Sequence, residues 1–281
     1  MGWLAGGFDL GPGRYQVDWT MHDSGGRGCS AHWNLDVKLA ARERKVALTL
    51  RENAVAARIA TPFEDEPPAV RAAGQPLRMK ILLNLSPAGA QESLLKPQDA
   101  AVLLSMLRSI VRESGVGRLT LIAFNLRAQK IVYQQDDVEQ IDFAALAKAL
   151  QTPAAGTIDY RLLQDRRSEA HFVTNLLIDQ LGSRTASQDA IVIVGPKVSL
   201  EKKVSLEMLR AAGAAPCPIF YLNYNPNPFE DPFPDTIGSA LKAYSAASKY
   251  DIVRPHDLGA AMRDILVRLD KQPAPETAFP K

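Results

Sequence analysis

Two different hydrophobic patterns divide this chain. In the first part, apolar and polar residues alternate over residues 15–21, 30–39 and 45–50. A period of two is typical of a β-strand with one buried face. The turn-forming residues 23–26 separate the first two runs, so we expect a β-hairpin there. The third run predicts a further strand, and residues 1–60 are therefore interpreted as a β-rich segment.

From Met79 onward, continuous apolar runs alternate with segments whose apolar residues recur every three or four positions. This pattern is typical of βαβ units and a mainly parallel sheet. Pro97 is well suited to the first position of a helix, and Asp142 is a typical N-cap. The predicted strands are 79–85, 118–126, 130–134, 190–194 and 218–223. One helix is predicted to start at Pro97, and a short one to run from Asp142 through Leu150. Four more are predicted over residues 160–181, 200–212, 237–248 and 258–269.

The two patterns predict two folded parts. Residues 61–78 contain four prolines and charges of both signs, which favours a linker that neither pairs in a sheet nor forms a helix. An α/β domain is expected over 79–271, followed by a polar tail over 272–281. The predicted fold class is α/β with helices on both faces of the sheet, preceded by the β-rich segment.

Composition excludes several classes of function. The net charge of +2 arises from 33 basic and 31 acidic residues that are mixed along the chain, so no basic patch for nucleic acid or a membrane surface is predicted. No apolar run reaches the ~18 residues needed to span a bilayer. The first ten residues do not resemble a signal peptide, which leaves the compartment open. Cys29 and Cys217 are far apart and have no metal-ligand spacing.

The carboxyl end of the first predicted α/β strand is where a ligand site is usually found. Here the strand leads into Asn84-Leu85-Ser86-Pro87-Ala88, which offers one amide and one hydroxyl. It has no carboxylate, no phosphate-binding glycine run and no general base. The sequence therefore predicts a binding module without a cofactor, rather than an enzyme.

The order of these elements resembles a von Willebrand factor type A domain. The resemblance rests on the strand, loop and helix at 79–113, the strand 119–124, the Gly156-Thr157 step and the strand 191–194. The resemblance covers about residues 79–270. Within the wider family, this part of the chain is similar to the related proteins of acidobacterial type, whose members carry an upstream β-rich segment. The resemblance implies a Rossmann-like fold and favours an extracytoplasmic location.

Family members bind a divalent ion through Asp-x-Ser-x-Ser, a later Thr and an Asp after the fourth strand. At the matching positions this chain has Asn84, Ser86 and Ala88, with Thr157 at the threonine position and Gly195-Pro196 where the aspartate would be. Magnesium needs hard oxygen ligands with anionic charge. The resemblance thus implies a degenerate site, and no metal is expected to bind tightly.

Three polar residues are candidates for partner binding at this edge. Asn84, Ser86 and Thr157 could converge on a small polar ligand or on a partner's carboxylate. Alternatively, they satisfy backbone groups of their own loops, as Asn, Ser and Thr commonly do. His171 and Cys217 lack a neighbouring catalytic partner in the sequence and are interpreted as structural.

The segment 221–235 is rich in proline and aromatic residues. Exposed aromatic rings are frequent anchors of protein interfaces, which makes Tyr224, Phe229 and Phe233 candidate contact residues. The alternative is that these rings pack back onto the domain.

The resulting hypothesis is a recognition module for a protein partner or a surface, without catalysis. One alternative is metal-dependent adhesion with Mg²⁺ or Mn²⁺, completed by a carboxylate such as Asp159. A hydrolase with an unrecognised cleft near His171 or Cys217 is another. A third is a structural element of a larger extracytoplasmic assembly.

Overall fold

The computed structural model describes residues 8–22, 25–39, 48, 50–57, 69, 71, 76–87, 95–151, 167–182, 188–225 and 234–270. The chain divides into two compact units, residues 1–61 and 62–281. The second unit contains a six-stranded sheet with helices, and the first contains antiparallel strands.

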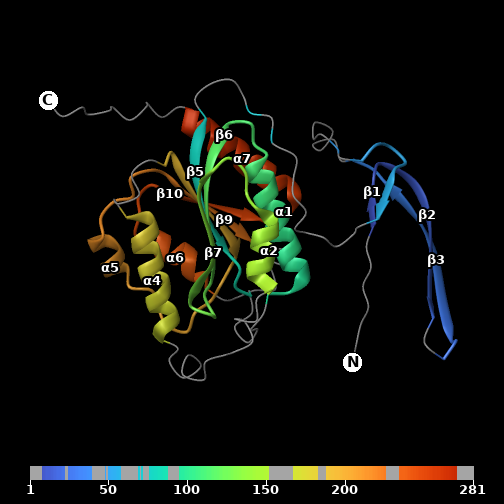
Figure 1. The fold of residues 1–281 in the computed structure, drawn as a ribbon, viewed down its shortest axis with the longest axis horizontal. Coiled ribbons are helices and arrows are strands. Elements are labelled where there is room, and N and C mark those ends of the chain that lie inside the picture. Colours follow the sequence, from blue (N-terminus) through green and yellow to red (C-terminus); the bar gives the residue numbers. More distant parts are fainter. Residues whose placement is uncertain are drawn as a thin grey trace. The chain divides into compact units, whose positions relative to one another are not determined.

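The sheet of the second unit has the strand order β10-β9-β8-β5-β6-β7 (Figure 1). Neighbouring strands are parallel except for β6 and β7, which are antiparallel. The predicted α/β class with a mainly parallel sheet is therefore confirmed. The strands are β5 (Leu77–Asn84), β6 (Val116–Asn125), β7 (Lys130–Val138), β8 (Ala190–Pro196), β9 (Ile219–Tyr224) and β10 (Ala247–Ile252).

The central strands are apolar throughout because both of their faces are covered. Every residue of β8 is buried, and along β5 Ile81 and Leu83 enter one hydrophobic layer while Leu82 enters the other. Residues of α1, α2 and α7 form the first layer with the sheet, and residues of α4, α5 and α6 form the second (Figure 1). These helices are α1 (Pro97–Val111), α2 (Phe143–Gln151), α4 (Arg167–Leu181), α5 (Leu206–Ala211), α6 (Thr236–Leu241) and α7 (Pro255–Asp270).

The helix starts follow from local sequence. Pro97 opens α1, as predicted. Asp142 Oδ1 accepts a hydrogen bond from Ala145 N at 2.7 Å, which confirms the predicted cap of α2. Asp235 caps α6 in the same way, accepting from Gly238 N at 2.9 Å. Within the described residues, the predicted helices 160–181 and 258–269 correspond to α4 and α7.

Two predicted helices have wrong boundaries, and one strand was not predicted. The helix expected over 200–212 is only α5, and the helix expected over 237–248 ends at Leu241. The next strand, β10, was not predicted. Its residues 247–252 alternate weakly in polarity, and it forms through its parallel pairing with β9, in which Tyr250 lies opposite Leu222. Tertiary pairing thus overrides the helical pattern of this alanine-rich segment.

The edge strand β7 is longer than predicted and irregular. It continues to Val138, and its register with β6 shifts between Leu119 and Leu121 and again between Ala123 and Phe124. Asp137 has a φ of 49°, in the left-handed region that few residues other than glycine occupy.

The end of the predicted linker belongs to the α/β unit. Leu77 and Arg78 are part of β5, so pairing in the sheet begins before residue 79. The guanidinium of Arg71 donates to the carbonyl oxygens of Val111, Glu113 and Glu139. The expectation that 61–78 stays outside the sheet is therefore wrong at its carboxyl end.

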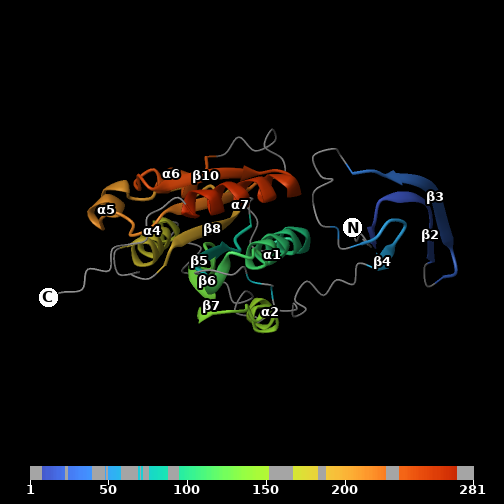
Figure 2. The same ribbon diagram turned by 90° about the horizontal axis from the view of Figure 1, so that it is seen from above.

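The first unit contains the predicted hairpin. Its strands β2 (Gly13–His22) and β3 (Gly28–Val37) pair antiparallel over their whole length (Figure 2). Two short strands, β1 (Phe8–Leu10) and β4 (Val55–Ala57), form a separate pair that the sequence did not predict. Leu48 and Leu50 are not in a strand, contrary to the prediction for 45–50, whose other residues lie outside the described part.

Candidate functional site

The carboxyl edge of the sheet has a topological switch point between β5 and β8. From β5 the chain continues to β6 on one side, whereas β8, β9 and β10 extend the sheet on the other. In open α/β sheets the crevice outside such a point is the usual ligand site. Asn84 is the last residue of β5, and Ser86 lies in the loop that follows it. Gly195 and Pro196 are the last two residues of β8.

Asn84 is completely buried and bridges the switch point. Its Nδ2 donates to the carbonyl oxygen of Pro196 at 3.4 Å, and its Oδ1 accepts from Ser86 N at 3.0 Å. One amide therefore ties the end of β5 to the end of β8 and also turns its own loop. This is the backbone-satisfying role that the sequence left open for Asn84.

Gly195 allows the two strands to approach closely. A Cβ atom at position 195 would lie 2.5 Å from Asn84 Cβ and 2.9 Å from the Asn84 carbonyl oxygen. Both separations are shorter than side-chain contacts permit. Position 195 is thus occupied by a residue without a side chain, and the neighbouring strand fills the space that a side chain would need.

Ser86 fixes the loop on the other side of β5. It is completely buried, and its Oγ accepts from Leu126 N at 2.7 Å. Asn125, at the end of β6, has a similar role: its Nδ2 donates to Leu85 O at 3.4 Å and its Oδ1 accepts from Ala128 N at 3.0 Å. Neutral side chains therefore connect the loops after β5 and β6 through the backbone.

A charged pair lies beside these loops. Arg127 Nη1 is 3.0 Å from both carboxylate oxygens of Glu169, at the start of α4, and the two side chains are 18% and 16% exposed. Nε and Nη2 of Arg127 are buried without a hydrogen-bond partner. Sequence reasoning missed this pair because its members are 42 residues apart and neither has a distinctive local pattern.

A second polar group connects β9, β10 and α6. The hydroxyl of the fully buried Tyr221 lies 3.2 Å from Asn223 Oδ1 and 3.3 Å from Asp235 Oδ1. Burial, together with the charge of Asp235, raises the pKa of Tyr221 well above its usual value. Lys249 Nζ lies 2.9 Å from Asp235 Oδ2 and 3.2 Å from Asp251 Oδ1. These contacts hold the start of α6 against the sheet.

Of the other predicted contact residues, only Tyr224 lies in the described part. It is half-buried and packs against the hydrophobic layer that contains α1. Burial, and then the charge of Asp99, raises the pKa of its hydroxyl. Thr157, Phe229 and Phe233, and the alternative ligand Asp159, lie outside the described residues. The structure thus brings Asn84 and Ser86 together and leaves the remaining candidates as predictions.

His171 and Cys217, near which a hydrolase cleft was considered, lie in different surroundings. Cys217 is buried, and its burial raises the thiol pKa to about 11 even though the nearby Lys80 lowers it. Such a thiol is almost entirely protonated at neutral pH, which makes it a poor nucleophile. His171 is exposed on α4.

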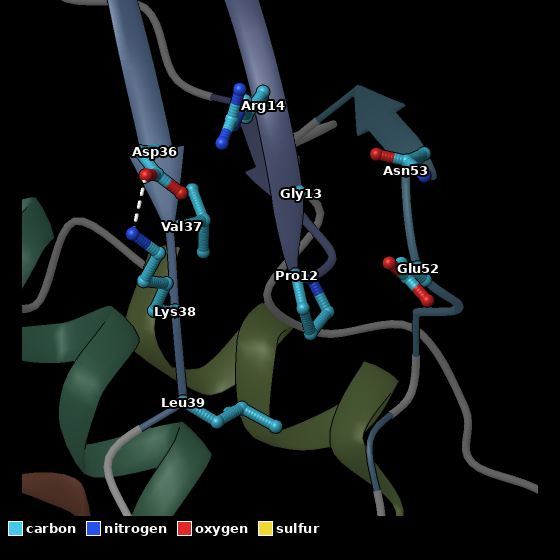
Figure 3. A pocket seen from close by; sticks show the side chains of 9 residues that line it. All are labelled: Pro12, Gly13, Arg14, Asp36, Val37, Lys38, Leu39, Glu52 and Asn53. Carbon is cyan, nitrogen blue, oxygen red and sulfur yellow. Dashed lines mark ion pairs between the residues drawn. The ribbon is translucent and has the colours of Figure 1, made fainter.

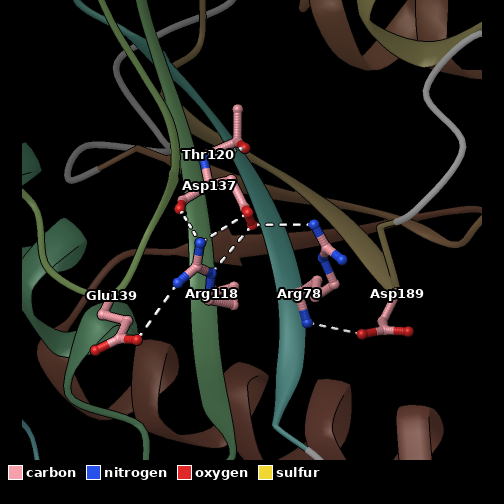
Figure 4. A network of polar contacts seen from close by, with 6 residues as sticks. All are labelled: Arg78, Arg118, Thr120, Asp137, Glu139 and Asp189. Carbon is pink, nitrogen blue, oxygen red and sulfur yellow. Dashed lines mark hydrogen bonds and ion pairs between the residues drawn. The ribbon is translucent and has the colours of Figure 1, made fainter.

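The amino edge of the same sheet carries exposed charges (Figure 4). Arg118 contacts Asp137 at 2.8 Å and Glu139 at 3.3 Å, while Arg78 contacts Asp137 at 3.0 Å. The hydrogen bond from Arg118 is the main cause that lowers the pKa of Asp137. Arg78 N also donates to Asp189 Oδ2 at 2.7 Å, which joins β5 to the residue before β8.

A surface recess of about 590 Å³ lies in the first unit, at the base of the hairpin (Figure 3). Arg14, Lys38, Asp36 and Glu52 line it, and Lys38 Nζ lies 2.6 Å from Asp36 Oδ2. With two basic and two acidic side chains, the lining favours neither anions nor cations.

The described residues offer neither a cluster of metal ligands nor a membrane-spanning helix. No group of three or more His, Cys, Asp or Glu side chains in this part of the chain is placed to hold a metal ion. None of the helices described is long and apolar enough to cross a bilayer.

Comparison with known proteins returned no match, either among protein-family models or among curated protein sequences.

Proposed function

We propose that the α/β unit is a non-catalytic recognition module similar to von Willebrand factor type A domains. It binds a protein partner or a surface through the carboxyl edge of its sheet and the segment 221–235, without a metal ion. The observation that carries this proposal is the use of Asn84 and Ser86, both buried, to hydrogen-bond the backbone of the same edge.

The chemistry of the edge supports binding more than catalysis. General acid–base catalysis needs a titratable group within reach of the substrate, and a Mg²⁺ site needs anionic oxygen ligands. At the switch point the side chains of Asn84 and Ser86 are neutral, and Gly195 leaves no room for a carboxylate. What this edge offers is a shape held by buried hydrogen bonds.

Calorimetric titration with MgCl₂ and MnCl₂ tests the metal-free part of the proposal. We expect no saturable binding up to roughly millimolar metal, the range of weak protein sites. Binding tighter than that would contradict the proposal and favour metal-dependent adhesion.

The contact surface is tested with the full chain immobilised as bait in an extract of its native source. The double variant Tyr224→Ala, Phe229→Ala should lose the partners that the wild type retains. The matched control is Met208→Ala, Val267→Ala, which removes exposed apolar side chains from α5 and α7. If all three baits recover the same partners, the segment 221–235 is not the contact surface.

A further inference from the structure

The hairpin of the first unit has one continuous apolar face. Its register places residues of β2 directly opposite residues of β3, and alternate residues point to the same side. Trp19, Met21 and Trp33 on this face are 44%, 40% and 42% exposed. The opposed pairs of the apolar face are Tyr15 and Leu35, Val17 and Trp33, Trp19 and Ala31, and Met21 and Cys29.

The other face of the hairpin is polar. Its opposed pairs include Gln16 with Asn34, Asp18 with His32, and Thr20 with Ser30, and all six residues are exposed. The hairpin is tied to the rest of its unit at its base, where the Tyr15 hydroxyl donates to Gly11 O at 2.7 Å. Figure 1 shows both long strands continuing past the short strand β1.

We infer that the apolar face of the β2–β3 hairpin binds the same face of a second copy of this chain. This interface is distinct from the recognition surface of the α/β unit and does not depend on it. A two-stranded hairpin alone is only marginally stable in water, and two amphipathic sheets bury their apolar faces by stacking about 10 Å apart.

The relief of the face favours a second copy as the occupant. Each large ring lies opposite a smaller side chain: Trp19 faces Ala31, and Trp33 faces Val17. The face thus has a projection on one strand beside a depression on the other, and the large side chain changes strand between the Val17–Trp33 pair and the Trp19–Ala31 pair. A twofold axis can place the projections of one copy over the depressions of the other, which is the self-complementarity that a symmetric dimer requires.

The size of the face limits the area that the contact can bury. Ten-residue strands are about 33 Å long, so two copies stacked face to face would bury on the order of 500 Å² each. The total of about 1,000 Å² is at the lower limit for a specific interface, where contacts are weak, and we take roughly 10–100 μM as the dissociation constant to test. The chain's net charge of +2 is small, so repulsion between copies is weak.

Sedimentation velocity of the full chain from about 2 μM to about 200 μM, a range that brackets this dissociation constant, measures the association. The wild type should shift from monomer to dimer. The variant Trp19→Thr, Trp33→Thr keeps residues that favour strands and should bind at least about tenfold more weakly. The matched control, Gln16→Thr with His32→Thr, alters the polar face and should dimerise like the wild type.

A second measurement uses only the wild type, in case the tryptophan variant fails to fold. Cys29 lies exposed on the apolar face, whereas Cys217 is buried. The rate constant for alkylation of Cys29 should fall severalfold over the same concentration range, because the partner copy covers the thiol.

Three results would overturn the inference: a wild type that stays monomeric throughout the range, a tryptophan variant that folds and dimerises as strongly as the wild type, or a Cys29 rate independent of concentration. The first and third mean that the face is not covered by a second copy, and the second means that the copies meet elsewhere. None of these results alters the metal or partner-capture tests of the α/β unit.

Discussion

The switch point at the carboxyl edge of the α/β sheet and the charged cluster at its amino edge are built on opposite principles. At the carboxyl edge, the buried Asn84 and Ser86 join loops through neutral hydrogen bonds to the backbone. At the amino edge, Arg118 and Asp137 form ion pairs that are about 40% exposed. Buried polar contacts are costly to break, whereas exposed ion pairs contribute little to stability. The comparison indicates that the shape of the carboxyl edge is fixed much more firmly than that of the amino edge.

The largest expected effect comes from Asn84→Asp. The carboxylate would be fully buried, would lose the bond that Nδ2 donates and would face the Pro196 carbonyl oxygen. We expect a loss of about 3–4 kcal/mol at neutral pH, the equivalent of a pKa raised by two to three units. A raised pKa means that the loss is smaller below the ordinary aspartate pKa of about 4 and grows as pH rises.

Urea unfolding at neutral and acidic pH measures this difference, with the exposed Asn175→Asp on α4 as the control. Recovery of the lost stability on adding Mn²⁺ would contradict the comparison, because the edge would then be a metal site lacking one ligand.

Gly195→Ala should be the next most damaging change. Its Cβ would lie 2.5 Å from Asn84 Cβ, so β5 and β8 would have to separate. Overpacking of this kind costs about 2 kcal/mol. Thermal unfolding compares it with Gly115→Ala, whose added Cβ would have its nearest neighbour, Leu266 Cδ2, at 3.7 Å. Equal stability of the two variants would mean that the switch point is looser than described.

Ser86→Ala removes the acceptor of the Leu126 N–H and leaves a buried donor without a partner. We expect a loss of about 1–2 kcal/mol. The control is Ser109→Ala on α1, because Ser109 Oγ is exposed and donates to Ser105 O within its own helix. Both variants are measured by denaturant unfolding, and a loss no larger than that of the control would contradict a structural role for Ser86.

Asp137→Asn should have the smallest effect. Asn tolerates the left-handed backbone of this position, but it loses the charge that pairs with Arg118 and Arg78. Because the folded-state pKa of Asp137 is lowered, its contribution is present above the ordinary value of 3.8 and is lost as pH falls through the folded-state value.

The stability difference between wild type and Asp137→Asn should therefore disappear in acid and shrink in high salt. Thermal unfolding at several pH values and salt concentrations measures it. An effect as large as that of Gly195→Ala would remove the contrast between the edges.

Much of the fold could be predicted because its signals are local. The apolar runs of β5 and β8, the alternation in β2 and β3, Pro97 and the Asp142 cap each act within a few residues. The strand β10 could not be predicted in this way, because its conformation depends on pairing with β9. The same holds for β1 and β4, which are 3 residues long and pair across more than 40 positions of the chain.

The candidate site was predictable in position but not in detail. The end of the first apolar strand identified Asn84 and Ser86, and parallel topology required them to lie at the carboxyl edge. Which groups they bond depends on Pro196 and Leu126, far along the chain. The pair of Arg127 with Glu169 is non-local in the same way and has no signature in the sequence.

The irregular edge strand β7 affects how copies of this protein can meet. Two register shifts in its pairing with β6 and the left-handed backbone at Asp137 make the strand irregular, and the exposed Asp136 adds an acidic side chain. An incoming strand would find neither an even ladder of donors and acceptors nor a neutral surface, and such features protect natural sheets from edge-to-edge polymerisation. The central sheet is therefore a poor template for fibril growth at this margin.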